Sequence, residues 1–377
     1  MTRRCAKLAM ISVLFAVLLL TVPQKNNVAQ AEVSTPSQAI DSIQIVGGIP
    51  ITEKLGSIYD GGKRITSGRD PDCARQTTGT ILCLFSNEFQ GTENIYSVTR
   101  RSDGTWTLPI YVSHNSSGHS RNPRVAISET GIHAVWQSDL PGYWTTYLGG
   151  LSDSGSWLSA PLPNGKGQNP SLASGNDGSI AVAWDDVLGT GESEILLVHI
   201  PSDVLPMIIS DVPGVRADVY ASLPITQLSN PAHPTGQASE PMSEHPPARY
   251  PSVAYYPIAD DFRVVWYEEG GFLRYAHGSH RSWTWPETIA TDLADSSPQI
   301  TRRLFGITAG WLTNSGQLLT KTSIGANTTW EAPVLQASDI RAFSLNEEAL
   351  AWVSTADLTD YVLWPPAKTT RLPLLAR

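Results

Sequence analysis

The sequence predicts an all-β protein: a six-bladed β-propeller of four-stranded antiparallel blades, with a seventh, irregular blade left open. Composition is the first observation behind this prediction. Charged residues make up only 16% of the 377 residues, while Gly and Pro number 30 and 27. Few charges and many turn-forming residues are typical of strands joined by turns. The 41% of hydrophobic residues can supply a large core, which argues against disorder.

The second observation is an internal repeat in which a proline precedes two apolar strands. The prolines that open its copies are Pro71, Pro123, Pro170, Pro251 and Pro298. Each copy continues into an apolar run that ends in an aromatic residue: Phe85, Trp136, Trp184, Trp266 or Trp311. Residues 340–352 form a sixth copy without the proline.

A third observation adds two more strands to most copies. A turn with a second tryptophan follows four of the apolar runs, at Trp106, Trp157, Trp283 and Trp330. One strand is expected before this turn and one after it. Four strands in a unit of roughly 40–50 residues is the period of a propeller blade.

The spacing of the aromatic residues also predicts the domain boundaries. The gap from Trp184 to Trp266 is much longer than the others, which predicts a proline-rich insertion at 201–249. Within it, residues 223–226 are expected to form the last strand of the third blade. The propeller is expected to span 67–377. Residues 32–66 form an N-terminal segment that either closes the last blade or builds the seventh.

The first 31 residues are predicted to be a secretory signal peptide. Arg3 and Arg4 precede an apolar run at 8–22, and small residues mark a cleavage site at 28–31. A retained single-span anchor is the alternative. After cleavage we expect a secreted, extracytoplasmic protein with no membrane span. Its net charge would be −9 − 4 = −13, since residues 1–31 hold four cations and no anions. Because that charge repels phosphate backbones, we expect no nucleic acid partner.

Two cysteines remain after cleavage, Cys73 and Cys83, on the first two strands of the first blade. With a turn near Thr78 they face each other across an antiparallel hairpin, at a Cα separation suited to a disulfide. An oxidising compartment favours that bond. Two buried free thiols are the alternative.

Arginine stands two residues before the repeat proline in three copies, as Arg69, Arg121 and Arg249. In a propeller this position opens the innermost strand of a blade, so the three guanidinium groups are expected to converge near the central axis. Forked donors of this kind bind carboxylates through two hydrogen bonds. The alternative is that these arginines pair with Asp70, Asp72 or Glu244 at the rim.

The R-x-P segment at Arg69, followed by a strand and the turn at 103–106, resembles the sialidase-like superfamily with Asp-box (BNR) repeats. The resemblance implies a propeller fold and an arginine triad that holds the carboxylate of an acidic sugar, with Arg69 as the matching member, although Asp70 replaces the usual isoleucine. It also implies an aspartate as general acid/base, at a position where this sequence has Glu88 and Glu93 and no aspartate, and a tyrosine nucleophile activated by a glutamate, for which Glu240 and Glu244 are candidates. The candidate catalytic carboxylates are Glu88, Glu93 and Glu244. The candidate tyrosines are Tyr143, Tyr256, Tyr267 and Tyr361.

Three functions from different classes remain open. The first is an exported propeller that recognises a glycan or glycoconjugate, with an acidic sugar on the axial arginines and with Tyr143 and Trp144 as aromatic contacts. The second is a sialidase-type glycoside hydrolase, as the resemblance implies. The third is a non-catalytic scaffold that binds a protein partner through 201–249. We expect no cofactor and no metal site, because paired histidines such as His114 and His119 lack a third ligand in a closed motif.

Overall fold

The computed structural model describes residues 40–363 with short gaps. These gaps are 47–48, 55–56, 61–62, 90, 115–116, 163–165, 188–192, 210–218, 220–221, 230–245, 280–281, 304–305, 326–328, 346–348 and 355–358. The expected signal peptide, Glu244 and most of the insertion at 201–249 therefore lie outside the described residues. No helix in the described part of the chain is long and apolar enough to cross a membrane.

Strands make up nearly all of the regular structure, and in the described residues they form seven sheets. The N-terminal sheet contains β1 (Ile40–Val46), β2 (Ile49–Lys54), β3 (Ser57–Asp60) and β4 (Lys63–Ser67). Blade one contains β5 (Arg69–Arg75), β6 (Ile81–Phe89), β7 (Thr92–Arg100) and β8 (Ile110–Tyr111). Blade two contains β9 (Ser120–Ser128), β10 (Gly131–Ser138), β11 (Thr145–Leu151) and β12 (Trp157–Pro161). Blade three contains β13 (Gly167–Ser174), β14 (Ile180–Val187), β15 (Ser193–Ile200) and β16 (Ile225–Gln227).

The remaining three sheets follow the same plan. Blade four contains β17 (Ala248–Tyr256), β18 (Asp261–Glu268), β19 (Phe272–Ser279), β20 (Ser282–Trp283) and β21 (Glu287–Ala290). Blade five contains β22 (Gln299–Arg303), β23 (Gly306–Leu312), β24 (Leu318–Ile324) and β25 (Val334–Ala337). Blade six contains β26 (Ile340–Leu345), β27 (Ala349–Ser354) and β28 (Thr359–Leu363). All neighbouring strands are antiparallel, which confirms the predicted all-β architecture.

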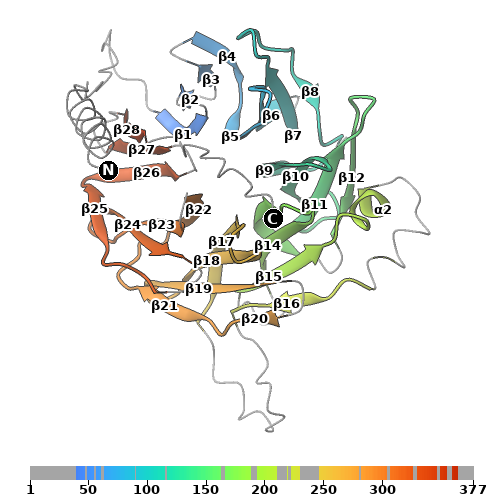
Figure 1. The fold of residues 1–377 in the computed structure, drawn as a ribbon. Coiled ribbons are helices and arrows are strands. Elements are labelled where there is room, and N and C mark those ends of the chain that lie inside the picture. Colours follow the sequence, from blue (N-terminus) through green and yellow to red (C-terminus); the bar gives the residue numbers. More distant parts are fainter. Residues whose placement is uncertain are drawn as a thin grey trace, which may run out of the picture. The chain divides into compact units, whose positions relative to one another are not determined.

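The sheets of residues 40–363 follow one another around a central space (Figure 1). The first strands of consecutive blades contact each other, and β1 contacts both β5 and the strands β26 and β27 of blade six. Residues 40–67, which the sequence left as a closing strand or a seventh blade, thus form a separate sheet between blades six and one. The first strands line a central cavity of about 1370 Å³.

The residue before the repeat proline adopts a left-handed backbone in blades one to four. The φ angles are 49° at Asp70, 51° at Asn122, 48° at Asn169 and 57° at Tyr250. Each lies where the register between the first and second strands shifts. Asp and Asn tolerate this conformation better than other residues with side chains, which explains three of the four choices. The resulting bulge sets the position of the preceding arginine in blades one, two and four.

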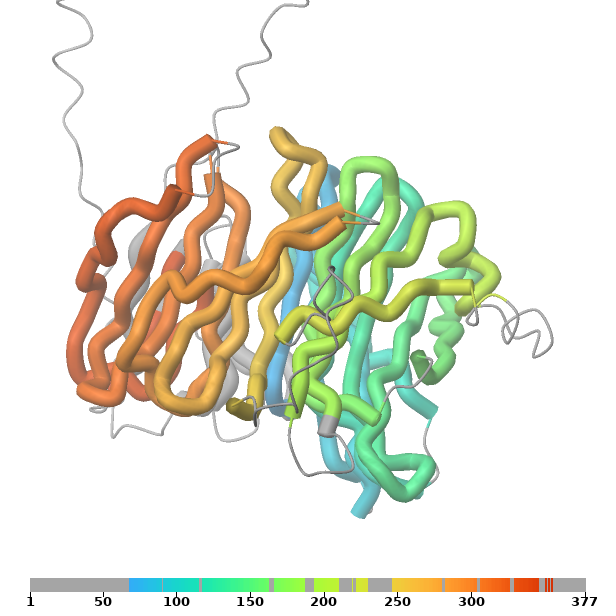
Figure 2. Tube along the Cα trace, turned by 90° about the horizontal axis from the view of Figure 1, so that it is seen from below, coloured from blue at the N-terminus to red at the C-terminus, as the bar shows by residue number. Residues whose placement is uncertain are grey.

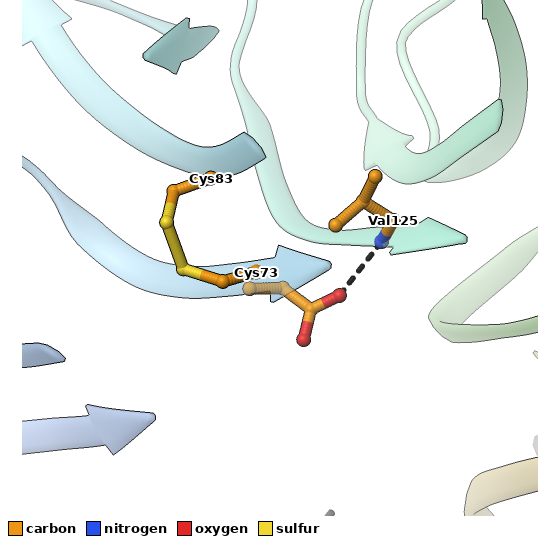
Figure 3. Close-up of a disulfide and its surroundings, with 4 residues drawn as sticks. Cys73, Cys83 and Val125 are labelled. Atoms are coloured by element: carbon orange, nitrogen blue, oxygen red, sulfur yellow. Dashed lines mark hydrogen bonds between the residues drawn. A yellow bond between two sulfur atoms is a disulfide. The ribbon is translucent and has the colours of Figure 1, made fainter. Parts of the chain in front are cut away.

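The residue after the repeat proline links one blade to the next in four cases. Its side-chain oxygen accepts a hydrogen bond from a backbone N–H of the following blade. The pairs are Asp72 with Val125 N (2.7 Å), Ser171 with Val253 N (3.0 Å), Ser252 with Ile300 N (3.1 Å) and Gln299 with Leu345 N (2.7 Å). Figure 3 shows the bond donated by Val125. We call these four bonds the blade latches.

The repeated aromatic residues fill the contacts between blades. Phe85, Trp136, Trp184, Trp266 and Trp311 are all fully buried. Trp184 packs in a cluster shared by blades two and three. Its close neighbour is Gly167, where an added Cβ would lie 2.1 Å from Trp184 Cδ1. Gly68 has the same relation to Phe85. A residue without a side chain is therefore needed beside these two aromatic rings.

The predicted disulfide between Cys73 and Cys83 is confirmed (Figure 3). The two residues are direct partners in the register of β5 and β6, with their Cα atoms 4.1 Å apart. Cys83 is completely buried in the core of blade one, where Phe85 and Val98 also lie.

Replacing both Cys73 and Cys83 with alanine should lower the free energy of unfolding by about 2–3 kcal/mol, because the bond closes a short loop in the unfolded chain. Denaturant unfolding of the oxidised protein and of the double variant measures this difference. Reduction should lower the denaturant midpoint of unfolding of the wild type and leave the midpoint of the double variant unchanged. Equal midpoints for the oxidised wild type and the double variant would contradict the prediction.

The insertion between β15 and β16 of blade three begins with the short helix α2 (Leu205–Ile209). Leu205 and Ile208 are buried against the cluster that also holds Trp184. The chain returns at β16, which pairs with β15 as the outer strand of blade three. The outer strand of blade three thus spans residues 225–227, two of which fall in the strand that the sequence predicted at 223–226.

Candidate functional site

The three arginines that precede the repeat prolines all lie at the beginning of first strands. Arg69 opens β5, and Arg121 and Arg249 are the second residues of β9 and β17. They therefore lie at the same end of their blades. The hairpins that join β6 to β7 and β10 to β11 project side by side at this end, at the lower edge of Figure 2. These hairpins supply the residues that meet Arg121.

Arg121 is held between a carboxylate and an aromatic ring. Its Nε–H donates a hydrogen bond to Glu93 Oε2 from β7. Its guanidinium carbon lies 5.7 Å from the ring centroid of Trp144, the last residue of the loop between β10 and β11. The Glu93 side chain is only 4% exposed, whereas 43% of the Arg121 side chain remains accessible. Glu93 accepts from the Nε–H, and among the described residues no hydrogen bond from the two Nη groups is found.

Asp70 lies close to this ion pair. Burial raises the pKa of Asp70 above the ordinary value for an aspartate, and the nearby Glu93 adds to that effect. The guanidinium groups of Arg124, Arg69 and Arg121 act in the opposite direction. Arg69, Asp70, Glu93, Arg121 and Trp144 thus form one group at the junction of blades one and two, which we call the Arg121 cluster.

Arg249 lies at a different junction, between blades four and five. Its Nη1 is 3.9 Å from Asp295 Oδ2, and both side chains are about half exposed. The adjacent Tyr250 donates its backbone N–H to Asp185 Oδ2 of blade three at 3.2 Å. Asp70 therefore lies in the electrostatic field of both Arg69 and Arg121, whereas Arg249 has an acidic partner at another junction. Among the described residues, Glu93 is the ion-pair partner of Arg121 and Asp295 that of Arg249, while Asp70 lies near Arg69 and Arg121. Glu244, also considered from the sequence, lies outside the described residues.

The carboxylates considered for catalysis occupy three different settings. Glu88 is exposed on the β6–β7 hairpin, Glu93 is buried under Arg121, and Glu244 lies outside the described residues. A tyrosine hydroxyl does donate to a carboxylate in blade four, from Tyr255 to Asp260. That pair lies at the opposite end of β17 from Arg249. It is therefore not placed to act on a ligand held by the arginines.

The two aromatic residues of the β10–β11 hairpin carry different cations. Trp144 lies against Arg121, while the Nζ of Lys166 lies 5.4 Å from the ring centroid of Tyr143. Lys166 precedes Gly167, whose N–H donates to the carbonyl of Trp144 at 3.1 Å. This bond keeps the start of blade three beside the hairpin. Two consecutive residues of one hairpin, Tyr143 and Trp144, therefore contact different cations, Lys166 and Arg121.

Blade three contributes an acidic group that the sequence analysis missed. Asp186 pairs with Glu194 across β14 and β15. Burial raises the pKa of Asp186 to about 6, opposed by the Lys166 ammonium and reinforced by Glu194 and Asp185. The available signal was two aspartates directly after a buried tryptophan, Trp184. In the described part of the chain, no group of three or more His, Cys, Asp or Glu side chains is arranged to hold a metal ion.

Comparison with known proteins bears on the fold. No family model matches the chain, and no curated protein matches it. A Hadza microbial sialidase superposes with a TM-score of 0.51 at 12% sequence identity, over 84% of this chain and 73% of its own. A fucose-specific lectin from Aleuria aurantia gives 0.45 at 13% identity, over 77% of this chain and 90% of its own. The Trypanosoma rangeli sialidase gives 0.48 at 10% identity, over 85% and 58%.

The likeness to the Hadza microbial sialidase is one of fold, and it shows that the chain has a β-propeller architecture like that of this sialidase. The resemblance read from the R-x-P segment and the Asp-box turn is thus confirmed at the level of architecture. At 12% identity it does not extend to any residue of the site. What the site does must follow from its own geometry.

Proposed function

We propose that the protein is an exported propeller that binds a glycan through an acidic sugar residue at the Arg121 cluster. The observation that carries this proposal is the state of Arg121. Its guanidinium is oriented by Glu93 and Trp144, and 43% of the Arg121 side chain is still exposed. A donor pair that is fixed before binding loses little side-chain freedom when a ligand arrives.

The chemistry of the cluster favours a carboxylate on a sugar ring. Two Nη groups on one guanidinium form parallel hydrogen bonds with the two oxygens of a carboxylate. Arg69 adds a second cation at the same junction. Trp144 adds an aromatic surface against which an apolar ring face can pack. Glu93 acts as a positioning residue in this arrangement, because its carboxylate is buried and bonded to Arg121.

Replacing Arg121 with alanine should weaken binding of an acidic monosaccharide by about 10–100-fold, since hydrogen bonds to charged groups contribute roughly 1.5–3 kcal/mol. Isothermal titration calorimetry with N-acetylneuraminic acid and with glucuronic acid measures the effect. Arg121→Lys keeps the charge but loses the forked donor, so it should also lose most of the affinity.

Arg101→Ala provides the matched control, because Arg101 is an exposed arginine of blade one in the turn after β7. Its affinity should equal that of the wild type. Galactose and fucose should not compete for the cluster. An Arg121→Ala variant that folds and binds acidic sugars as tightly as the wild type would overturn the proposal.

A further inference from the structure

A pocket of about 660 Å³ opens beside the β10–β11 hairpin. We call it the Tyr143 pocket. Its lining includes Tyr143, Thr145, Tyr147, Leu162 and Lys166, and none of them belongs to the Arg121 cluster. Small-molecule sites in proteins have volumes of roughly 300–1,000 Å³ and combine aromatic walls with a few polar groups. The Tyr143 pocket meets both conditions.

Thr145 supplies a polar group without a partner among the described residues. The residue is only 5% exposed, and its Oγ1 is buried with no hydrogen bond to any of them. A buried hydroxyl without a partner is unfavourable by roughly 1–3 kcal/mol. Since Thr145 lines the pocket, a rotation of its side chain on binding would present this hydroxyl to a ligand hydroxyl and supply the missing hydrogen bond.

Tyr143 and Lys166 make the rest of the pocket suitable for a sugar ring. Half of the Tyr143 side chain is exposed, which leaves aromatic surface for the apolar face of a ring. Lys166 holds an ammonium near the same ring. The charge of Lys166 is balanced by Asp186, whose ionised form Lys166 favours. A pocket with balanced charge suits an uncharged, hydroxyl-rich ligand better than a second anion.

We infer that the Tyr143 pocket is a second subsite that binds a neutral sugar residue next to the acidic one. This inference rests on the proposed function, which places the acidic residue on Arg121. Trp144 contacts Arg121, and the preceding residue, Tyr143, lines the pocket, so consecutive side chains of one hairpin serve the two subsites. The ligand is then an oligosaccharide of at least two residues with an acidic residue at one end.

Calorimetry with N-acetylneuraminic acid, with lactose and with the trisaccharide 3′-sialyllactose tests this inference. The trisaccharide should bind the wild type about tenfold more tightly than the monosaccharide does. Tyr143→Ala and Thr145→Val should each remove most of that gain and change the affinity for the monosaccharide by less than twofold. Thr145→Val only replaces a hydroxyl that has no partner, so this variant should fold.

Leu140→Ala is the matched control, because Leu140 is an exposed residue of the same hairpin that does not line the pocket. It should keep the full gain. Equal affinities for monosaccharide and trisaccharide, or a gain that survives Tyr143→Ala, would overturn the second subsite and leave the Arg121 cluster in place. If the acidic sugar does not bind, the binding of lactose, measured by saturation-transfer NMR, tests the Tyr143 pocket on its own. Binding that Tyr143→Ala abolishes supports the pocket alone, and the absence of lactose binding refutes it.

Discussion

Trp184→Ala should lower the free energy of unfolding by about 3–5 kcal/mol, the range found when a buried tryptophan or phenylalanine is truncated. Trp184 is fully buried and joins the cores of blades two and three. Its removal leaves a cavity that Gly167 cannot fill, since a glycine has no side chain to move into the space. Equilibrium unfolding in urea, followed by circular dichroism, measures the loss.

Trp285→Ala serves as the control for this change. Trp285 is half exposed in blade four, so its truncation should affect stability far less. A similar loss in both variants would mean that burial between blades is not what makes Trp184 important. A loss confined to Trp184 supports the assignment of the repeated aromatic residues to the contacts between blades.

The protein should lose up to roughly 3 kcal/mol of stability through His133 alone as the pH falls from about 6.5 to about 4. His133 is buried, neither of its ring nitrogens has a hydrogen-bond partner in the described part of the chain, and Ile209 of α2 lies nearby. Burial lowers the pKa of His133 to about 4. The folded state thus favours the neutral ring, while the unfolded chain takes up a proton below the ordinary histidine pKa. The stability associated with the neutral His133 ring is fully present above pH 6.5 and is lost as the pH falls from about 6.5 to about 4.

The comparison of wild type with His133→Leu isolates this effect. The stability of the variant should fall less steeply between pH 6.5 and pH 4, whereas His114→Asn, at an exposed histidine, should keep the wild-type slope. Asp186 acts in the opposite direction in the same window. Its raised pKa makes its contribution complete below the ordinary aspartate value and lost as the pH rises through about 6. Parallel slopes for the wild type and His133→Leu would contradict the assignment.

Much of the fold could be predicted because the repeat carries local signals. The proline and the terminal aromatic mark the first two strands of five blades, and the cysteine pair falls on facing positions of one hairpin. Residues 40–67 carry neither landmark, so the sequence could not distinguish a separate sheet from a closing strand. The left-handed backbone before the repeat prolines could have been predicted at Asn122 and Asn169, because asparagine tolerates this conformation. It could not have been predicted at Tyr250.

The site was harder to predict because its contacts connect different blades. The repeat pattern identified Arg121, but its partner Glu93 lies 28 residues earlier on the preceding blade. Arg249 and Asp295 also come from different repeat units, which explains why their pairing could not be predicted from the repeat. Nothing local to Glu93 indicates that its carboxylate is buried under an arginine. Pairings of this kind depend on how adjacent hairpins meet, which one copy of a repeat does not encode.

The blade latches give the ring a direction. In each of the four, the acceptor belongs to the earlier blade and the donor to the later one, so the bonds all point the same way along the chain. The protein is synthesised from its N-terminus, so the blade with the acceptor is made before the blade with the donor. Each later blade of these four pairs therefore finds its acceptor already present. Loss of blades from the C-terminus leaves side-chain oxygens that water can satisfy. Loss from the N-terminus instead uncovers backbone N–H groups on a free inner strand, which is the surface that recruits other chains. Fragments that lack the N-terminal blades should therefore be the more prone to aggregate.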